Sequence, residues 1–159
     1  MYILKIKKLY CTVIISICLM LSTSQSQAIE ELKYNDSLGV SLIFQIDKFL
    51  QEQYKSNSKY YDIASIDLNN DGILEHILRR KTCDIQKNLC SHIIIAEKAD
   101  RILLLSKIRA HKLMIDSKAS YGIKNLLAFR NNENEYNYDI YMWSPKENMY
   151  IMSKQRTED

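Results

Sequence analysis

The sequence has few of the residues that interrupt regular structure, with three glycines and one proline among 159 residues. This shortage excludes a collagen-like chain and a glycine- and proline-rich low-complexity chain. An excess of one charge is also lacking beyond residue 28. Three of the 22 basic residues and none of the 19 acidic ones precede that point, so 19 basic groups face 19 acidic groups in residues 29–159. A neutral domain gives no electrostatic reason to expect nucleic acid or an anionic membrane as a partner.

No apolar run is long enough to predict a transmembrane helix. The most apolar segment, Leu9 to Leu21, would form only about 20 Å of helix, against about 30 Å of hydrocarbon in a bilayer. It follows three lysines and precedes Ser26-Gln27-Ala28, whose small residues suit a signal peptidase. Residues 1–28 are therefore predicted to be a cleaved signal peptide, and the mature protein to be periplasmic or secreted without a stable membrane anchor. A retained anchor and a lipoprotein modified at Cys18 are the alternatives.

Cysteine is scarce in the predicted mature chain, where Cys83 and Cys90 remain of the four cysteines. An even pair in an oxidising compartment predicts a disulfide. The six residues between them are polar and turn-like, and this spacing fits neither a C-x-x-C redox pair nor a four-ligand zinc site. Closing so small a loop is expected to stabilise the protein by roughly 2–3 kcal/mol.

Hydrophobic periodicity divides the mature chain into one helix and a series of strands. Apolar residues recur at helical spacing from Leu42 to Leu50, which predicts a helix over residues 38–54, with N-cap chemistry at 35–37 and Gly39 in its first turn. Short β-rich runs separated by turn residues follow at 61–67, 73–80, 92–98, 101–108, 123–130, 136–143 and 148–153. Short connections favour antiparallel neighbours. We expect a single α+β domain over residues 29–159, with the N-terminal helix packed on a twisted, mainly antiparallel β-sheet meander.

One segment carries specific chemistry, the nonapeptide Asp67-Leu68-Asn69-Asn70-Asp71-Gly72-Ile73-Leu74-Glu75, here called the acidic loop. Calcium takes six to eight oxygen ligands, and a loop can supply them by pointing alternate side chains inward. The predicted calcium ligands follow that spacing: Asp67, Asn69, Asp71, the Ile73 carbonyl and Glu75. Gly72 is expected to permit a sharp turn at a place where a Cβ would obstruct the chain.

The acidic loop is not predicted to be an EF-hand. Leu78 stands at its twelfth position, where an EF-hand has a bidentate glutamate, and the flanking residues are typical of strands. Asn-Asp-Gly is also a favoured turn sequence without any metal, so an empty hairpin turn is one alternative. A different or a catalytic metal is the other. A bound calcium is expected to clip two strands together and to stabilise the fold.

The pattern strand, D-x-N-x-D-G-x-x-E, strand resembles the calcium loop of FG-GAP or VCBS-type repeats, as in the blades of integrin-like β-propellers. A wider resemblance covers roughly residues 60–153, because small secreted bacterial proteins carry such a loop, then a cysteine pair flanking a hairpin turn, then a late aromatic strand. The resemblance implies a metal role for the five predicted ligands alone. One loop cannot build a propeller, and Asn70 replaces the glycine common at that position. Some extracytoplasmic inhibitor or immunity proteins are similar in size and architecture.

An aromatic cluster near the C-terminus is the candidate contact surface. Over residues 136–143 the chain alternates, which places Tyr141 and Trp143 on one face of a strand with Asn137 and Asp139. Exposed Tyr and Trp give a large contact area at small entropic cost. Tyr141 and Trp143 are therefore the predicted partner-binding residues. The alternative is that the helix or another loop covers them.

No motif predicts catalysis. His76, His92 and His111 are scattered, and neither a G-x-S-x-G elbow nor a phosphate-binding loop occurs. Arg79-Arg80-Lys81 is interpreted as a solvated strand end, or alternatively as a contact for an acidic partner.

We therefore expect no enzyme and no catalytic residues, but an exported protein-binding module with structural calcium. Its predicted partner is another extracytoplasmic protein, and an inhibitor or immunity protein for a cell-envelope hydrolase or toxin would suit its size. The alternatives are a structural or assembly component of the envelope and a hydrolase whose catalytic residues the sequence does not reveal.

Overall fold

The computed structural model describes residues 29–34, 37–84, 88–99, 101–131 and 137–156, so the predicted signal peptide lies outside the described residues. The elements in chain order are β1 (Glu30–Glu31), α2 (Val40–Tyr54), the 3-10 helix η1 (Ser58–Tyr60), β2 (Tyr61–Ile66), β3 (Glu75–Arg80), β4 (Cys90–Lys98), β5 (Arg101–Ala110), β6 (Lys112–Ser120), β7 (Ile123–Phe129), β8 (Tyr138–Ser144) and β9 (Met149–Arg156). Among these ranges, neither helix is long and apolar enough to cross a membrane.

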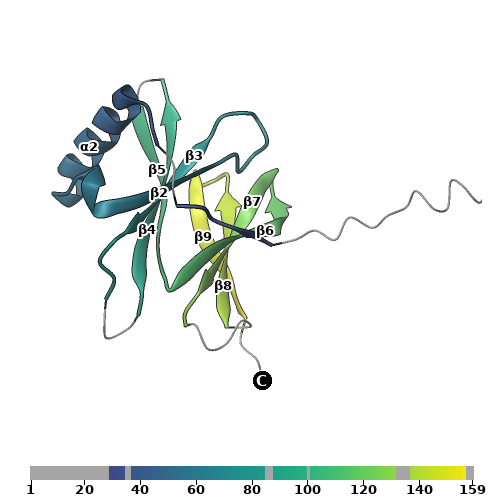
Figure 1. The fold of residues 1–159 in the computed structure, drawn as a ribbon. Coiled ribbons are helices and arrows are strands. Elements are labelled where there is room, and N and C mark those ends of the chain that lie inside the picture. The colour runs from purple at the N-terminus through teal and green to yellow at the C-terminus, as the bar shows by residue number, and fades with distance from the viewer. Residues whose placement is uncertain (1–28, 35–36, 85–87, 100, 132–136, 157–159) are drawn as a thin grey trace, which may run out of the picture.

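The strands form two antiparallel sheets. One has the order β2-β3-β4-β5 and the other the order β1-β6-β7-β8-β9. Figure 1 shows α2 on the outer side of the β2–β5 sheet and the second sheet on the other side. The prediction of a mostly antiparallel α+β fold with one helix is confirmed at this level, but the expected single sheet is wrong because the strands divide between two.

Alternate residues of the β2–β5 sheet enter two different cores. Ile77 and Ile94 lie in the inter-sheet core, which also holds Leu126 of the second sheet. Their chain neighbours Leu78 and Ile93 lie in a second cluster with Ile46 and Leu50 of α2. Successive side chains of a strand point to opposite faces, so a strand buried on both faces reads as a continuous apolar run such as Ile93-Ile94-Ile95.

The sequence analysis did not predict β6, which pairs with β1 and β7. Its middle, Asp116-Ser117-Lys118, is polar, and the register with β7 shifts between Ile115 and Ala119. A bulge of this kind interrupts the alternation on which a strand is recognised from sequence. The strand β1 spans only two residues and was missed as well, since it has no periodicity to detect.

The start of the helix differs from the prediction. Gly39 is the N-cap residue, in an extended conformation, and no side chain caps the helix. Of the residues expected to supply N-cap chemistry, Asn35 and Asp36 lie outside the described residues, and Ser37 precedes the observed cap. The predicted N-cap is therefore wrong, since the first helical hydrogen bond is the one that the Gly39 carbonyl accepts from the Ile43 amide at 3.0 Å.

Candidate functional site

The acidic loop connects β2 to β3 and is closed by hydrogen bonds to its first carboxylate. Asp67 accepts one from the Asp71 amide at 3.2 Å and one from the Gly72 amide at 2.9 Å. The Gly72 amide is the largest of the causes that hold the pKa of Asp67 below its usual range. The first residue of the motif therefore serves as the anchor around which the loop turns.

Further hydrogen bonds connect the middle of the loop. The Asn69 side chain accepts from the Asp71 amide at 2.9 Å, and Asp71 accepts from the Ile73 amide at 2.7 Å. The Asn69 side-chain amide also donates to the second oxygen of Asp71 at 2.9 Å. These bonds between side chains and backbone two residues on are typical of Asn and Asp in turns.

Gly72 is required by its backbone conformation. Its φ of +84° lies in the left-handed region, where residues with a Cβ are strained. A Cβ built at this position would meet no atom within 4 Å. The expectation that a Cβ would obstruct the chain is therefore wrong, and the need for glycine arises from φ alone.

Glu75 is the buried carboxylate of the loop, with 7% of its surface exposed. Its side chain accepts a hydrogen bond from the Leu68 amide at 2.8 Å. Burial raises the pKa of Glu75, and the negative charges of Asp71 and Asp67 raise it further. His76, the next residue, points to the other face of β3 and forms a hydrogen bond with Ser65 at 2.9 Å.

The five predicted calcium ligands offer only oxygen atoms, which is the chemistry that calcium prefers. Their carboxylates do not converge, however. Within the ranges that the structure describes, no three His, Cys, Asp or Glu side chains gather where they could hold a metal ion. In the same ranges, no lysine or arginine forms an ion pair with Asp67, Asp71 or Glu75. Calcium binding therefore stays a prediction, with a folded loop and an unbalanced negative charge in its favour.

The fold brings the acidic loop to Trp143, which is far from it in the sequence. Both line a cavity of about 350 Å³ together with Leu103 of β5 and Lys98 of β4. We call it the loop cavity. Trp143 packs edge-on against Tyr150, with ring centroids 5.7 Å apart. The Tyr150 hydroxyl donates a hydrogen bond to the Lys124 carbonyl at 2.8 Å, which connects β9 to β7 beneath the cavity.

The two predicted partner-binding residues lie on the face of β8 that packs against the inter-sheet core. Tyr141 and Trp143 are both partly buried there. The sequence analysis named the helix or a loop as the possible cover for these residues. They are instead partly buried against the core between the two sheets, and the sequence analysis did not anticipate the division into two sheets. Trp143 lines the loop cavity, whereas Tyr141 does not, and a partner-binding role for the two residues stays a prediction.

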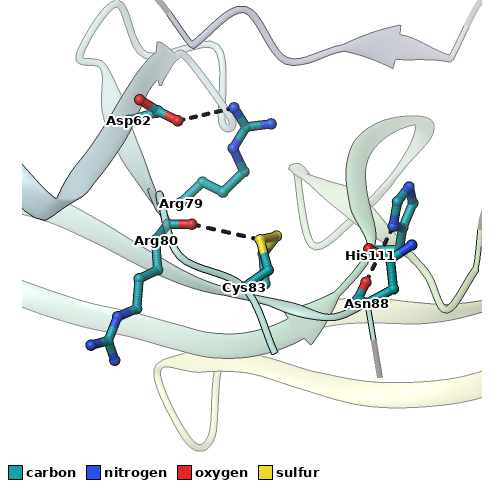
Figure 2. Close-up of a disulfide and its surroundings, with 7 residues drawn as sticks. Asp62, Arg79, Arg80, Cys83, Asn88 and His111 are labelled. Carbon is teal, nitrogen blue, oxygen red and sulfur yellow. Dashed lines mark hydrogen bonds and ion pairs between the residues drawn. A yellow bond between two sulfur atoms is a disulfide. The ribbon is translucent and has the colours of Figure 1, made fainter. Parts of the chain in front are cut away.

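The predicted disulfide is present at the opposite end of β3 and β4 and joins Cys83 to Cys90 (Figure 2). Asp84 and Leu89 form a bridge between the cysteines, and Arg109 of β5 forms an ion pair with Asp84 at 3.0 Å. Figure 2 also shows His111 in hydrogen-bond contact with the Asn88 carbonyl at 3.2 Å. The bond therefore closes the turn between two neighbouring strands.

The sequence analysis missed the importance of His92. Its side chain is completely buried, and neither ring nitrogen has a hydrogen-bond partner among the described residues. Burial lowers the pKa of His92 to about 4, and the positive charge of Arg79 acts in the same direction. The available signal was its position two residues before Ile94 on an apolar strand, which places the imidazole on a buried face.

In comparisons with known proteins, no family model, no curated protein and no solved structure matched this chain. The resemblance of the acidic loop to FG-GAP or VCBS-type repeats therefore remains a prediction from the motif.

Proposed function

We propose that this protein is an exported, non-catalytic binding module that contacts another extracytoplasmic protein through the loop cavity. The observation that carries the proposal is the meeting of the acidic loop with Trp143 around one cavity of about 350 Å³. A mainly apolar recess with a few polar groups is the usual form of a site that receives one side chain of a partner. The disulfide is consistent with an oxidising location outside the cytoplasm.

The charge of the cavity indicates what a partner would insert. Asp71 and Glu75 contribute carboxylates, against one lysine, Lys98. Trp143 contributes an aromatic ring, which attracts a cation above its face. A lysine or arginine side chain of the partner would pack its stem on the apolar wall and place its charge near the carboxylates.

The rim of the cavity adds apolar contact area. Ile73 at the tip of the acidic loop is 58% exposed, and Leu103 of β5 is 42% exposed. Exposed apolar side chains gathered at a recess are typical of protein contact sites. The rim therefore offers hydrophobic contacts around a polar centre that selects for positive charge.

The proposal includes a structural calcium ion held by Asp67, Asn69, Asp71, the Ile73 carbonyl and Glu75. It is supported by the folded loop, by the exclusively oxygen donors and by the negative charge that no described cation balances. Binding would require the carboxylates of Asp71 and Glu75 to turn from backbone amides toward the ion. The ion would strengthen the wall of the loop cavity without taking part in a reaction.

The proposed partner is a cell-envelope hydrolase or toxin, so that the protein acts as an inhibitor or immunity protein. This choice is supported by the size of the protein, by the predicted signal peptide and by the absence of a recognised catalytic motif in the sequence. A structural or assembly component of the envelope and an unrecognised hydrolase are the competing proposals, and both give different results in the following experiment.

The test uses the purified hydrolase or toxin encoded beside the gene of this protein. We expect binding by calorimetry and loss of the partner's activity. Ile73→Asp should weaken the affinity about tenfold or more, because it places a charge in an apolar contact. Phe44→Asp is the matched control, since Phe44 is 71% exposed on the distant face of α2. Self-association without binding would favour a structural component, and cleavage of an envelope polymer by this protein alone would favour a hydrolase.

A further inference from the structure

A second cavity, of about 440 Å³, opens beside the disulfide at the other end of the inter-sheet core. We call it the disulfide cavity. Three cationic residues line it besides Arg80, namely Arg79, Lys81 and Lys112, whereas the side chain of Arg80 points to the other face of the strand (Figure 2). Two carboxylates, Asp62 and Glu31, oppose them. The excess charge is therefore positive even when the two histidines that also line the cavity are neutral.

Three polar residues form a row across the inter-sheet face at this cavity. Asp62 of β2 is the register partner of Arg79 on β3, and Arg79 is the partner of His92 on β4. Register partners point to the same face of a sheet. Arg79 contacts Asp62 with one nitrogen at 3.1 Å, as Figure 2 shows. A guanidinium carries five N–H donors, so Arg79 keeps donors for a ligand.

Tyr34 lies over this row. The Arg79 guanidinium is 4.1 Å from the centre of the Tyr34 ring, and the Tyr34 and His92 rings are 6.4 Å apart. The aromatic ring holds the guanidinium in place without using its N–H donors. The arrangement therefore presents an oriented cation at the wall of the cavity.

The polar atoms of this site are unsatisfied. Both ring nitrogens of His92 and the Tyr34 hydroxyl are buried without a hydrogen-bond partner among the residues that the structure describes. The backbone of Cys90 and of Ile108 interacts with the His92 ring and favours its charged form, but the geometry of neither contact is that of a full hydrogen bond. An unsatisfied buried polar group costs about 1–3 kcal/mol, and proteins rarely keep several in one place. Three such atoms at one cavity indicate a missing hydrogen-bonding ligand.

We propose that the disulfide cavity binds the carboxylate of a ligand whose neighbouring group is apolar, such as the C-terminal residue of a peptide or a small branched carboxylic acid. Arg79 donates to the carboxylate, and His92 and Tyr34 complete its hydrogen bonds. Leu32, Leu113 and the disulfide supply apolar walls. This site is independent of the proposed function, because it lies at the opposite end of β3 and β4 from the loop cavity.

The chemistry of the site excludes the other small ligands. A cation would be repelled by Arg79 and its neighbours, and a neutral amide would leave the excess positive charge unbalanced. Phosphate gains little from the apolar walls and stays strongly hydrated, whereas a carboxylate is matched by the planar fork of arginine. A carboxylate with an apolar group is the ligand that satisfies both parts of the cavity.

The experiment is a titration of the full-length mature protein followed by NMR of the histidine ring nitrogens, with the His92 signals assigned from His92→Asn. N-acetyl-leucine represents a peptide C-terminus, and isovalerate represents a free carboxylic acid. N-acetyl-leucinamide is the control for charge, because it has the same apolar group without a carboxylate. Inorganic phosphate is the control for shape, because it is an anion without an apolar group. We expect saturable shifts of His92 with one or both carboxylates, and the tighter of the two identifies the source of the ligand. No saturable shift at millimolar concentration, or equal shifts with the amide or with phosphate, would overturn the proposal.

Variants locate the binding. Arg79→Gln should weaken carboxylate binding about tenfold or more, since it removes a charge-assisted hydrogen bond. Tyr34→Phe should weaken it less while leaving the fold intact, and serves if Arg79→Gln does not fold. Arg101→Gln is the matched control, because Arg101 is the register partner of Lys98 at the end of β4 and β5 that lies far from the disulfide cavity. Equal affinity in the wild type, Arg79→Gln and Tyr34→Phe would also reject the site.

Discussion

The two ends of the inter-sheet core carry opposite charge. At the loop cavity, the buried carboxylate of Glu75 stands near Asp71 and Asp67, and its pKa is raised. At the disulfide cavity, the buried imidazole of His92 stands near Arg79, and its pKa is lowered. The same two strands, β3 and β4, connect the two sites. At each end, the surroundings therefore disfavour the charged form of a buried titratable group. A cationic ligand at the loop cavity would favour the charged form of Glu75, and an anionic ligand at the disulfide cavity would favour that of His92.

The largest expected effect concerns the basic end and its dependence on pH. The pKa of His92 is about 4 in the folded protein and 6.5 without perturbation. Because the folded value is the lower one, the unfolded chain binds the proton first as pH falls. Stability is therefore complete above about pH 6.5 and declines toward pH 4, by roughly 3 kcal/mol in total. Urea unfolding at several pH values measures this decline.

The control for that prediction is His92→Gln, which removes the titrating group. Its stability should decline less between pH 6.5 and 4 than that of the wild type, because the remaining slope belongs to other titratable groups of the protein. An identical slope in the two proteins would show that His92 does not titrate as its burial requires.

Removal of the disulfide is expected to have the next largest effect. The Cys83→Ser, Cys90→Ser double variant loses the closure of a loop between cysteines seven positions apart, worth about 2–3 kcal/mol of unfolding free energy. Hydrogen exchange should rise at the ends of β3 and β4 near the disulfide and stay unchanged at Glu75. Chemical denaturation gives the size of the loss, and an even rise of exchange over both ends would contradict the separation of the two sites.

Calcium should act on the acidic end alone. At a free concentration tenfold above its Kd, a structural ion stabilises the fold by about 1.4 kcal/mol, which raises the melting temperature by a few degrees. Asp71→Ala should abolish this increase, and Glu147→Ala, which removes an exposed carboxylate outside the loop, should preserve it. Melting curves with calcium and with a chelator are the measurement. The same curve in both conditions would remove calcium from the proposal.

The smallest effect is expected for Glu75→Gln in the presence of chelator. The side-chain amide oxygen can still accept the hydrogen bond from the Leu68 amide. The substitution also removes the repulsion between the Glu75 carboxylate and the negative charges of Asp67 and Asp71. The gain in unfolding free energy should be on the order of 1 kcal/mol. Thermal unfolding at neutral pH measures it, and a loss of stability would show that the Glu75 charge is compensated in the folded protein.

Much of the fold was predictable because its signals are local. The helix, the disulfide and seven strands each arise from a short run of residues with a definite period or spacing. The strand β6 was not predictable, since its bulge and polar centre hide the alternation. The division into two sheets was not predictable either, because the continuous apolar run Ile93-Ile94-Ile95 shows that both faces are buried without showing what covers each.

The candidate sites divide in the same way. The acidic loop was recognised because its hydrogen bonds join residues within a single nonapeptide, so its shape is encoded where it forms. The meeting of that loop with Trp143, and of Tyr34 with Arg79 and His92, joins residues that are distant in the chain. Sequence alone determined the periodicities, the turn and the cysteine pair. Only the packing of one sheet on the other decided which charged side chains share a cavity, because burial and long-range register belong to the assembled sheets and to no single segment.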